Sequence, residues 1–273
     1  MEKKKWTPVS VLGLVLIVVF TITCIAPFIY MILMSFTKST TLTLQLSEIN
    51  FSDLSNFSHV FKKSGFFSAL KNSVIVVGCS CFFNCVVASM AAYGFEKKRF
   101  PGREKIYNAY VATMMVPAQV TMVPVFIIMK KMGMLNTYFS LVVLIINAFG
   151  ILLIRSFMAN VPDELLEAAK VDGCPEHKIF LKIVIPLIKP VLISLVVFTF
   201  VSSWNDFLWP LVSTTDSDMY TLTVALSLLK TQYNTNYGLI MAGAAVSFIF
   251  PFILYVFLQK QFVEGIALSG VKG

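Results

Sequence analysis

Charged residues are spread unevenly along this chain. Five long stretches contain none: 6–37, 72–95, 106–129, 132–154 and 231–259. Each exceeds the roughly 20 residues that a helix needs to cross the hydrocarbon core of a membrane. A sixth apolar stretch carries a single carboxylate, Asp206. The pattern predicts an all-α, polytopic membrane protein with one domain, 1–273, and six transmembrane helices near 11–36, 69–95, 106–129, 137–158, 190–212 and 238–259.

The composition excludes a soluble domain, because 57% of the residues are hydrophobic and only 13% are charged. The first apolar stretch follows the basic start MEKKK and so resembles a secretory signal peptide. It is too long for the apolar part of a signal peptide, and no small-x-small cleavage motif precedes the next polar loop. We therefore expect it to be retained as a membrane span.

The basic residues predict the orientation in the membrane. With the N-terminus in the cytoplasm, most of the 22 Lys and Arg residues fall in cytoplasmic segments. The positive-inside rule then favours a cytoplasmic location for both termini. The net charge of +8 suits anionic lipid of the inner leaflet, and no nucleic-acid partner is needed to explain it.

The sequence lacks the groups that would supply energy or catalysis. It contains no phosphate-binding G-x-x-x-x-G-K-[ST] loop. Ion-coupled carriers keep carboxylates within the membrane, whereas Asp206 is the one acid in a predicted span here. The two histidines lie in different loops, and Cys79, Cys81 and Cys85 do not share one helix face. We expect no catalytic residue, no metal site and no cofactor on this chain.

The polar stretch 160–190 separates two apolar ones and predicts a helix–turn–helix. Pro162 and the acidic residues after it suit the first turn of a helix. Gly173 follows the last regular residue, where glycine adopts a left-handed terminating conformation at low cost. Phe180 lies on the apolar side of the second helix, and Pro186 marks the bend back toward the membrane. The product is a cytoplasmic elbow that either packs on its own spans or docks another protein, and sequence physics leaves both open.

The elbow resembles the EAA loop of ATP-binding-cassette importer permeases, because EAAKVDG is followed by IPLIKP. In that family the loop forms coupling helices that insert into a cleft of a cytoplasmic ATPase. The resemblance implies that the two helices act as a lever between the ATPase and the membrane helices. The residues that it assigns to ATPase coupling are Glu167, Ala168, Ala169, Asp172, Gly173, Phe180 and Pro186.

Four further motifs resemble the carbohydrate-uptake (maltose MalG-like) branch of that family. They are KNSVIV…AAYGFEKKRFPGR at 71–103, MMVPAQVTMVPVF…MLNT at 114–137, SSWNDFLWPLV at 202–212 and FVEGIALSGVKG at 262–273. The resemblance implies a non-catalytic permease subunit of a binding-protein-dependent sugar importer, with oligosaccharide as cargo, in the cell membrane of a prokaryote. Its implied partners are a second homologous permease, two copies of an ATP-binding subunit that carries ATP and Mg, and an extracytoplasmic solute-binding protein.

The C-terminal tail, 260–273, resembles one that also reaches the ATPase pair. A frayed terminus explains the same short, polar residues. The tail residues assigned to this contact are Gly265, Gly270, Lys272 and Gly273.

Several polar residues lie at membrane depth. They could line a pathway for the cargo, or they could form hydrogen bonds between helices, worth roughly 0.6–2 kcal/mol each. They are Asn84, Gln119, Asn147, Asn205 and Asp206. Trp204 and Trp209 could stack on a sugar, but we assign them to the aromatic belt at the membrane interface.

Two other functions stay open beside a sugar importer. One is an ATP-driven importer of another solute, such as glycerol phosphate, whose permeases share these motifs. The other is an ion-coupled secondary carrier, which the scarcity of intramembrane carboxylates disfavours.

Overall fold

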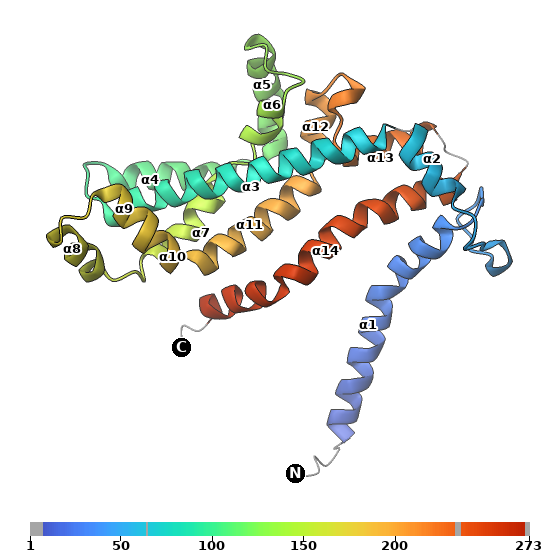
Figure 1. Cartoon of the computed structure of the whole chain (residues 1–273), viewed down its shortest axis with the longest axis horizontal. Coiled ribbons are helices and arrows are strands. Elements are labelled where there is room, and N and C mark those ends of the chain that lie inside the picture. The colour runs from blue at the N-terminus through green and yellow to red at the C-terminus, as the bar shows by residue number, and fades with distance from the viewer. Residues whose placement is uncertain (1–7, 64, 233–235, 271–273) are drawn as a thin grey trace. The chain divides into compact units, whose positions relative to one another are not determined.

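The computed structural model describes residues 8–63, 65–232 and 236–270, and every regular element among them is a helix (Figure 1). The all-α prediction is therefore confirmed. The chain divides into two compact units, one made of 1–66 with 226–249 and the other of 67–225 with 250–273.

The first unit is built on α1, Pro8–Ser35, whose 28 residues are apolar enough to span a membrane. Only its last turn is buried. A helix satisfies its own backbone hydrogen bonds, so the exposed apolar sides suit contact with lipid. In α2, Ser55–Lys63, the Asn56 side chain donates to the carbonyls of Ser35 (2.9 Å) and Thr37 (2.7 Å). These two bonds fix the start of the loop that follows α1.

The second unit contains most of the helices. Its first helix, α3 (Phe66–Lys97), begins at the boundary between the units and runs without a break. The helices that follow in chain order are α4 (Arg103–Ala112), α5 (Ala118–Lys131), α6 (Tyr138–Val143), α7 (Ala148–Met158), α8 (Asp163–Val171), α9 (Glu176–Ile179), α10 (Ile185–Leu187), α11 (Lys189–Trp204), α12 (Leu208–Ser213), α13 (Leu222–Gln232) and α14 (Tyr237–Gly270). A π-helix, Phe180–Val184, joins α9 to α10, and α13 and α14 each belong to both units.

Length and composition identify three helices that could cross a membrane among the described residues, namely α1, α3 and Tyr237–Phe257 of α14. Two bent pairs would bring the total to five. The first pair joins Arg103–Met115 to Ala118–Lys131 at 104°, and the second joins Glu176–Leu187 to Lys189–Trp204 at 77°. The predicted spans at 106–129, 137–158 and 190–212 are therefore not straight helices, since each contains a break.

The breaks have local causes in the sequence. Pro117 has no N–H with which to continue the preceding turn, so α5 begins afresh behind it. Asn147 caps α7, because its Oδ1 accepts a hydrogen bond from the N–H of Phe149 (3.0 Å). Asp206 lies in the break between α11 and α12. Proline and polar side chains within apolar stretches thus begin new helices.

A buried apolar core joins the elbow, residues 160–190, to the membrane helices of the second unit. Its members come from α3, α7, the elbow and α11, and they are Ala88, Ala92, Tyr93, Ile151, Ile154, Met158, Val161, Leu166, Ala169, Ile179, Val184, Ile188, Val191 and Leu195. α7 approaches its neighbours closely at Gly150, where an added Cβ would lie 3.1 Å from Ala88 Cβ and 3.3 Å from Leu195 Cδ1. Figure 1 shows α8 and α9 at one end of α3. The elbow is therefore packed into the unit and is not a free loop.

Candidate coupling elbow and polar cavity

The first helix of the elbow, α8, ends in a glycine turn. The N–H of Cys174 bonds to the Ala169 carbonyl (2.9 Å), and the N–H of Gly173 bonds to the Lys170 carbonyl (3.0 Å). This pair of bonds is a Schellman motif, and Gly173 has the left-handed conformation that the motif requires, at φ 74°. The prediction that Gly173 ends the first helix in this way is confirmed. An added Cβ would meet nothing within 4 Å, so the backbone conformation alone favours glycine here.

The second half of the elbow bends later than the sequence predicted. Pro186 lies inside α10, and the 77° bend falls between Leu187 and Lys189. Pro190 explains this position, because a continuous helix would need the Pro190 N–H to bond to the Pro186 carbonyl. Assigning the bend to Pro186 is therefore wrong. Pro186 instead follows the π-helix, a wider turn that accommodates its missing N–H.

The predicted coupling residues divide between two sides of the elbow. Ala169 is buried, and the half-buried ring of Phe180 packs on Tyr93 with ring centroids 5.2 Å apart. The apolar side chain of Val171, near the glycine turn, is 87% exposed. The coupling residues that are also exposed are Glu167, Ala168, Asp172, Gly173 and Pro186. One side of the elbow thus packs in the core, while the glycine turn lies open to solvent.

Lys97, the last residue of α3, and Lys98, the residue after it, hold the elbow at two separate points. Lys97 Nζ donates to Asp163 Oδ1 (2.7 Å) and to a backbone carbonyl (2.6 Å), and only 6% of its side chain is exposed. Its hydrogen bond holds the pKa of Asp163 below the usual value. Lys98 pairs with Glu176, which also accepts a hydrogen bond from Tyr93. Both halves of the elbow are therefore anchored to α3 by charge-assisted bonds.

Arg155 links α7 to α3 and α4 beside these anchors. Its guanidinium donates to carboxylate oxygens of Glu96 (2.8 Å) and Glu104 (2.8 Å). Its Cζ lies 3.9 Å from the ring centre of Tyr107, and only 13% of its side chain is exposed. A single cation, largely covered by its neighbours, thus joins three helices beside the elbow.

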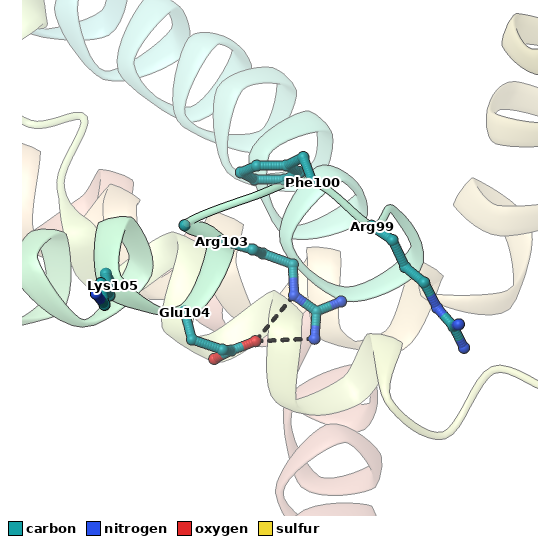
Figure 2. A pocket seen from close by; sticks show the side chains of 6 residues that line it. Arg99, Phe100, Arg103, Glu104 and Lys105 are labelled. Carbon is teal, nitrogen blue, oxygen red and sulfur yellow. Dashed lines mark hydrogen bonds and ion pairs between the residues drawn. The ribbon is translucent and has the colours of Figure 1, made fainter.

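The turn between α3 and α4 forms a basic hollow next to this network. The hollow has a volume of about 470 Å³ and is lined by Arg99, Phe100, Gly102, Arg103, Glu104 and Lys105. Figure 2 shows the Glu104 carboxylate facing Arg103, whereas the side chains of Arg99 and Lys105 point away from that pair. The cations do not converge on one point, so they form a basic surface and not a ligand site. We call this turn, with the adjoining elbow, the basic end of the second unit.

A cavity of about 380 Å³ lies where three broken segments of the second unit meet. Its lining comes from the start of α5, the break between α6 and α7, and the break between α11 and α12. The lining residues are Ala118, Gln119, Thr121, Met122, Val125, Leu144, Ile145, Asn147, Ser202, Asp206, Leu208 and Trp209. Three predicted pathway residues, Gln119, Asn147 and Asp206, therefore line one cavity. Helix breaks free backbone polar groups, which is tolerated at membrane depth where they face a water-filled space.

The other two predicted pathway residues are not among those lining this cavity. Asn84 is buried and donates to Thr199 Oγ1 (2.9 Å), a bond between α3 and α11. Asn205 ends α11 and donates to the Val201 carbonyl (2.9 Å). For these two side chains the structure shows hydrogen bonds between or within helices, which is the alternative to a pathway role.

Trp204 and Trp209 are buried within the chain, with 6% and 7% of their surface exposed. Trp204 stacks on Phe200 with ring centroids 5.6 Å apart. Trp209 Nε1 donates to the Ser140 carbonyl (2.8 Å). Their assignment to an aromatic belt at the membrane interface is therefore wrong.

Sequence reasoning missed the polar contacts that hold the elbow and the helices beside it. The bonds of Tyr93 to Glu176, Lys97 to Asp163, and Arg155 to Glu96 join residues 83, 66 and 59 positions apart. The available signal is that Glu96 and Lys97 follow one charge-free stretch and Arg155 follows another, but a charge at the end of an apolar stretch does not identify its partner.

The predicted tail contacts fall at the end of the chain. Gly265 and Gly270 lie within α14, and Lys272 and Gly273 lie outside the described residues.

Long apolar helices, a cavity at helix breaks and an anchored elbow at a basic end define this chain as a polytopic membrane protein of the transporter class. Residues 85–267 match the family described as binding-protein-dependent transport system inner membrane component. The chain belongs to this family, and its identification as an importer permease from the EAA loop is confirmed.

Several relatives in this comparison are sugar permeases. The chain is 33% identical over 257 residues to the arabinooligosaccharides transport system permease protein AraQ of Halalkalibacterium halodurans, which covers 90% of this chain and 91% of that one. It is 33% identical over 251 residues to the lactose transport system permease protein LacG of Rhizobium radiobacter, which covers 91% of each. A solved bacterial ABC transporter involved in import of the acidic polysaccharide alginate has the same fold, with a TM-score of 0.82 and 24% identity over 95% of this chain and 100% of that one.

Proposed function

We propose that this chain is the permease subunit of an ATP-driven importer of sugars, in particular oligosaccharides. The observation that carries the proposal is the elbow, which exposes a glycine turn on one side and packs into the membrane helices on the other. Such an element suits the transfer of motion from a docked protein to a pathway. Relatives named for arabinooligosaccharides, lactose and diacetylchitobiose support a sugar as the cargo.

In this proposal the chain crosses the inner membrane six times, with both termini in the cytoplasm. The basic end then faces the cytoplasm, as the positive-inside rule requires, and its cations meet anionic headgroups of the inner leaflet. The spans at 106–129, 137–158 and 190–212 cross as broken helices. Their breaks meet at the polar cavity, which forms one half of the translocation pathway.

The proposed partners follow from the missing energy source. Two copies of a cytoplasmic ATPase bind ATP and Mg and hydrolyse ATP, and the exposed turn of the elbow docks on one of them. A second, homologous permease supplies the other half of the pathway. An extracytoplasmic solute-binding protein delivers the sugar, and the alginate transporter solved with its pentasaccharide-bound periplasmic protein supports this arrangement.

Purification of the chain from its native membrane in a mild detergent tests the assembly. We expect an ATPase, a second permease and no other stoichiometric partner, identified by mass spectrometry. Recovery of the chain alone, under conditions that keep other transporters of the membrane intact, would contradict the proposal.

Uptake assays separate the three candidate functions. Deletion of the gene is expected to abolish uptake of a labelled oligosaccharide, and unlabelled glycerol phosphate should not compete in the wild type. Competition by glycerol phosphate would instead identify the other solute. An ion-coupled carrier would show uptake that persists without any ATPase and collapses with the proton gradient.

Replacing Gln119 by leucine is expected to weaken passage of the sugar through the cavity. Loss of one hydrogen bond to a hydroxyl-rich cargo should lower uptake about threefold to tenfold, while the basal rate of ATP hydrolysis stays unchanged. The matched control is Val120→Leu, because Val120 is exposed on α5 but is not among the residues lining the cavity. Equal uptake by both variants in proteoliposomes would remove Gln119 from the pathway.

A further inference from the structure

Among the predicted spans that lie wholly within the second unit, the one in α3 is the span without a break. The pairs α4 and α5, α6 and α7, and α11 and α12 are interrupted, whereas α3 continues through 32 residues. At 1.5 Å per residue this is about 48 Å, which exceeds the hydrocarbon thickness of a bilayer. A single helix therefore joins the basic end of the unit to its far end (Figure 1).

At the basic end, a buried cation of α3 holds the elbow. Lys97 Nζ lies 2.7 Å from Asp163 Oδ1 and 2.6 Å from the Val161 carbonyl, so its acceptors lie on and just before α8. With 6% of its side chain exposed, Lys97 has little water to replace them. Separating α8 from α3 would leave a buried charge unpaired, at a high energetic cost. The second half of the elbow is held by a more exposed contact, because Glu176 accepts from Tyr93 of α3 and pairs with Lys98, and 47% of its side chain is exposed.

At the far end, buried side chains of α3 hold the segment 217–222. Asn72 Nδ2 donates to two carbonyls of this segment at 2.6 and 3.0 Å, and Asn72 Oδ1 accepts from the hydroxyl of Tyr138 (2.7 Å). Ser73 Oγ accepts from the N–H of Leu222 (2.8 Å). Asn72 is 2% exposed and Ser73 is 4% exposed. A buried polar group that loses its partner costs its full desolvation energy, so these bonds hold the segment firmly to α3.

We propose that α3 is a rigid rod that transmits displacement of the elbow to the segment 217–222, with Lys97 and Asn72 as the positioning residues at its two ends. The broken helices bend at their breaks beside the cavity, while the unbroken α3 is displaced as one body. The inference rests on the proposed function, because it identifies the path between the ATPase side and the side that receives the solute-binding protein.

If α3 acts as a rod, the effects of two substitutions at its opposite ends should not be additive. Independent effects at sites this far apart are additive in free energy. In a rod, however, the two contacts act in series, so losing either one interrupts transmission and losing the second removes little more. Non-additivity over a helix of about 48 Å is therefore the signature of the proposal.

The test is a double-mutant cycle of Lys97→Met and Asn72→Leu in the complete complex, reconstituted in lipid nanodiscs. The measured quantity is the ratio of ATP hydrolysis with the sugar-loaded binding protein to ATP hydrolysis without it. Each single variant should lower this ratio about threefold or more. The ratio of the double variant should equal that of the single variant with the lower ratio. Lys97→Arg should recover part of the ratio. The control cycle uses Lys105→Met and Asn108→Leu, both exposed on α4, and should leave the ratio unchanged.

The rod proposal is contradicted if the fold-losses of the two single variants multiply in the double variant. It is also contradicted if either single variant leaves the ratio of ATP hydrolysis rates unchanged. If Lys97→Met fails to assemble, Asp163→Asn with Ser73→Ala gives a milder cycle, because Asp163 is largely exposed and Lys97 keeps the Val161 carbonyl. A wild-type complex that neither transports sugar nor responds to the binding protein would contradict the proposed function. A responsive wild type with additive variants contradicts the rod alone.

Discussion

Replacing Gly173 by valine is expected to lower sugar uptake about tenfold or more, because the glycine turn cannot keep its shape. At φ 74° a β-branched residue carries about 1–3 kcal/mol of backbone strain. No clash contributes, since an added Cβ meets nothing within 4 Å. Relief of the strain would open the Schellman motif and change the angle between α8 and α9. The elbow would then present its exposed face to the ATPase in the wrong orientation.

Two further variants separate coupling from general stability in this experiment. Gly173→Asn should keep most of the uptake, since asparagine tolerates the left-handed conformation better than other side chains. Gly133→Val is the matched control, because Gly133 has a φ of 66° and equally open surroundings but lies outside the elbow. Uptake in proteoliposomes is divided by the amount of assembled complex. Equal losses for the two valine variants would mean that strain alone, and not the elbow, limits transport.

The elbow could be predicted from the sequence because its signals are local. Pro162 precedes the first residue of α8, and Gly173 acts on hydrogen bonds to Ala169 and Lys170. The bend was placed wrongly because Pro186 and Pro190 each lack an N–H. Which of the two turns the chain depends on whether the helix can widen locally, as it does in the π-helix before Pro186.

The cavity could be predicted only in part. Gln119, Asn147 and Asn84 look alike in the sequence, as polar residues in apolar stretches. Packing separates them, because Gln119 and Asn147 lie at helix breaks while Asn84 lies mid-helix beside Thr199. The partners of Lys97 and Arg155 lie far away in the chain, so sequence periodicity carries no information about them. Local structure is thus set by near neighbours, and the contacts that link the elbow to the membrane helices are set by the fold.

Replacing Arg155 by methionine is expected to destabilise the second unit by about 2–4 kcal/mol, the largest stability loss among these variants. The substitution leaves Glu96 and Glu104 without their shared cation and removes the contact with the Tyr107 ring. Glu96 is 25% exposed and Glu104 is 53% exposed, so solvent screens part of the cost. For a chain of this size the melting temperature of the purified protein should fall by roughly 5–15 °C.

Arg103→Met is the matched control for Arg155→Met, since Arg103 also pairs with Glu104, at 2.9 Å, but is more exposed. Its loss should cost about 0–1 kcal/mol, as for surface pairs. Arg155→Lys should fall between the two, because an ammonium keeps the charge but cannot place two N–H groups on two carboxylates in the fixed geometry of a guanidinium. Thermal unfolding in one detergent, followed by tryptophan fluorescence, measures all three. If Arg155→Met and Arg103→Met melt at the same temperature, Arg155 does not hold α3, α4 and α7 together, and the anchoring of the elbow must rest on the apolar core and the two lysines.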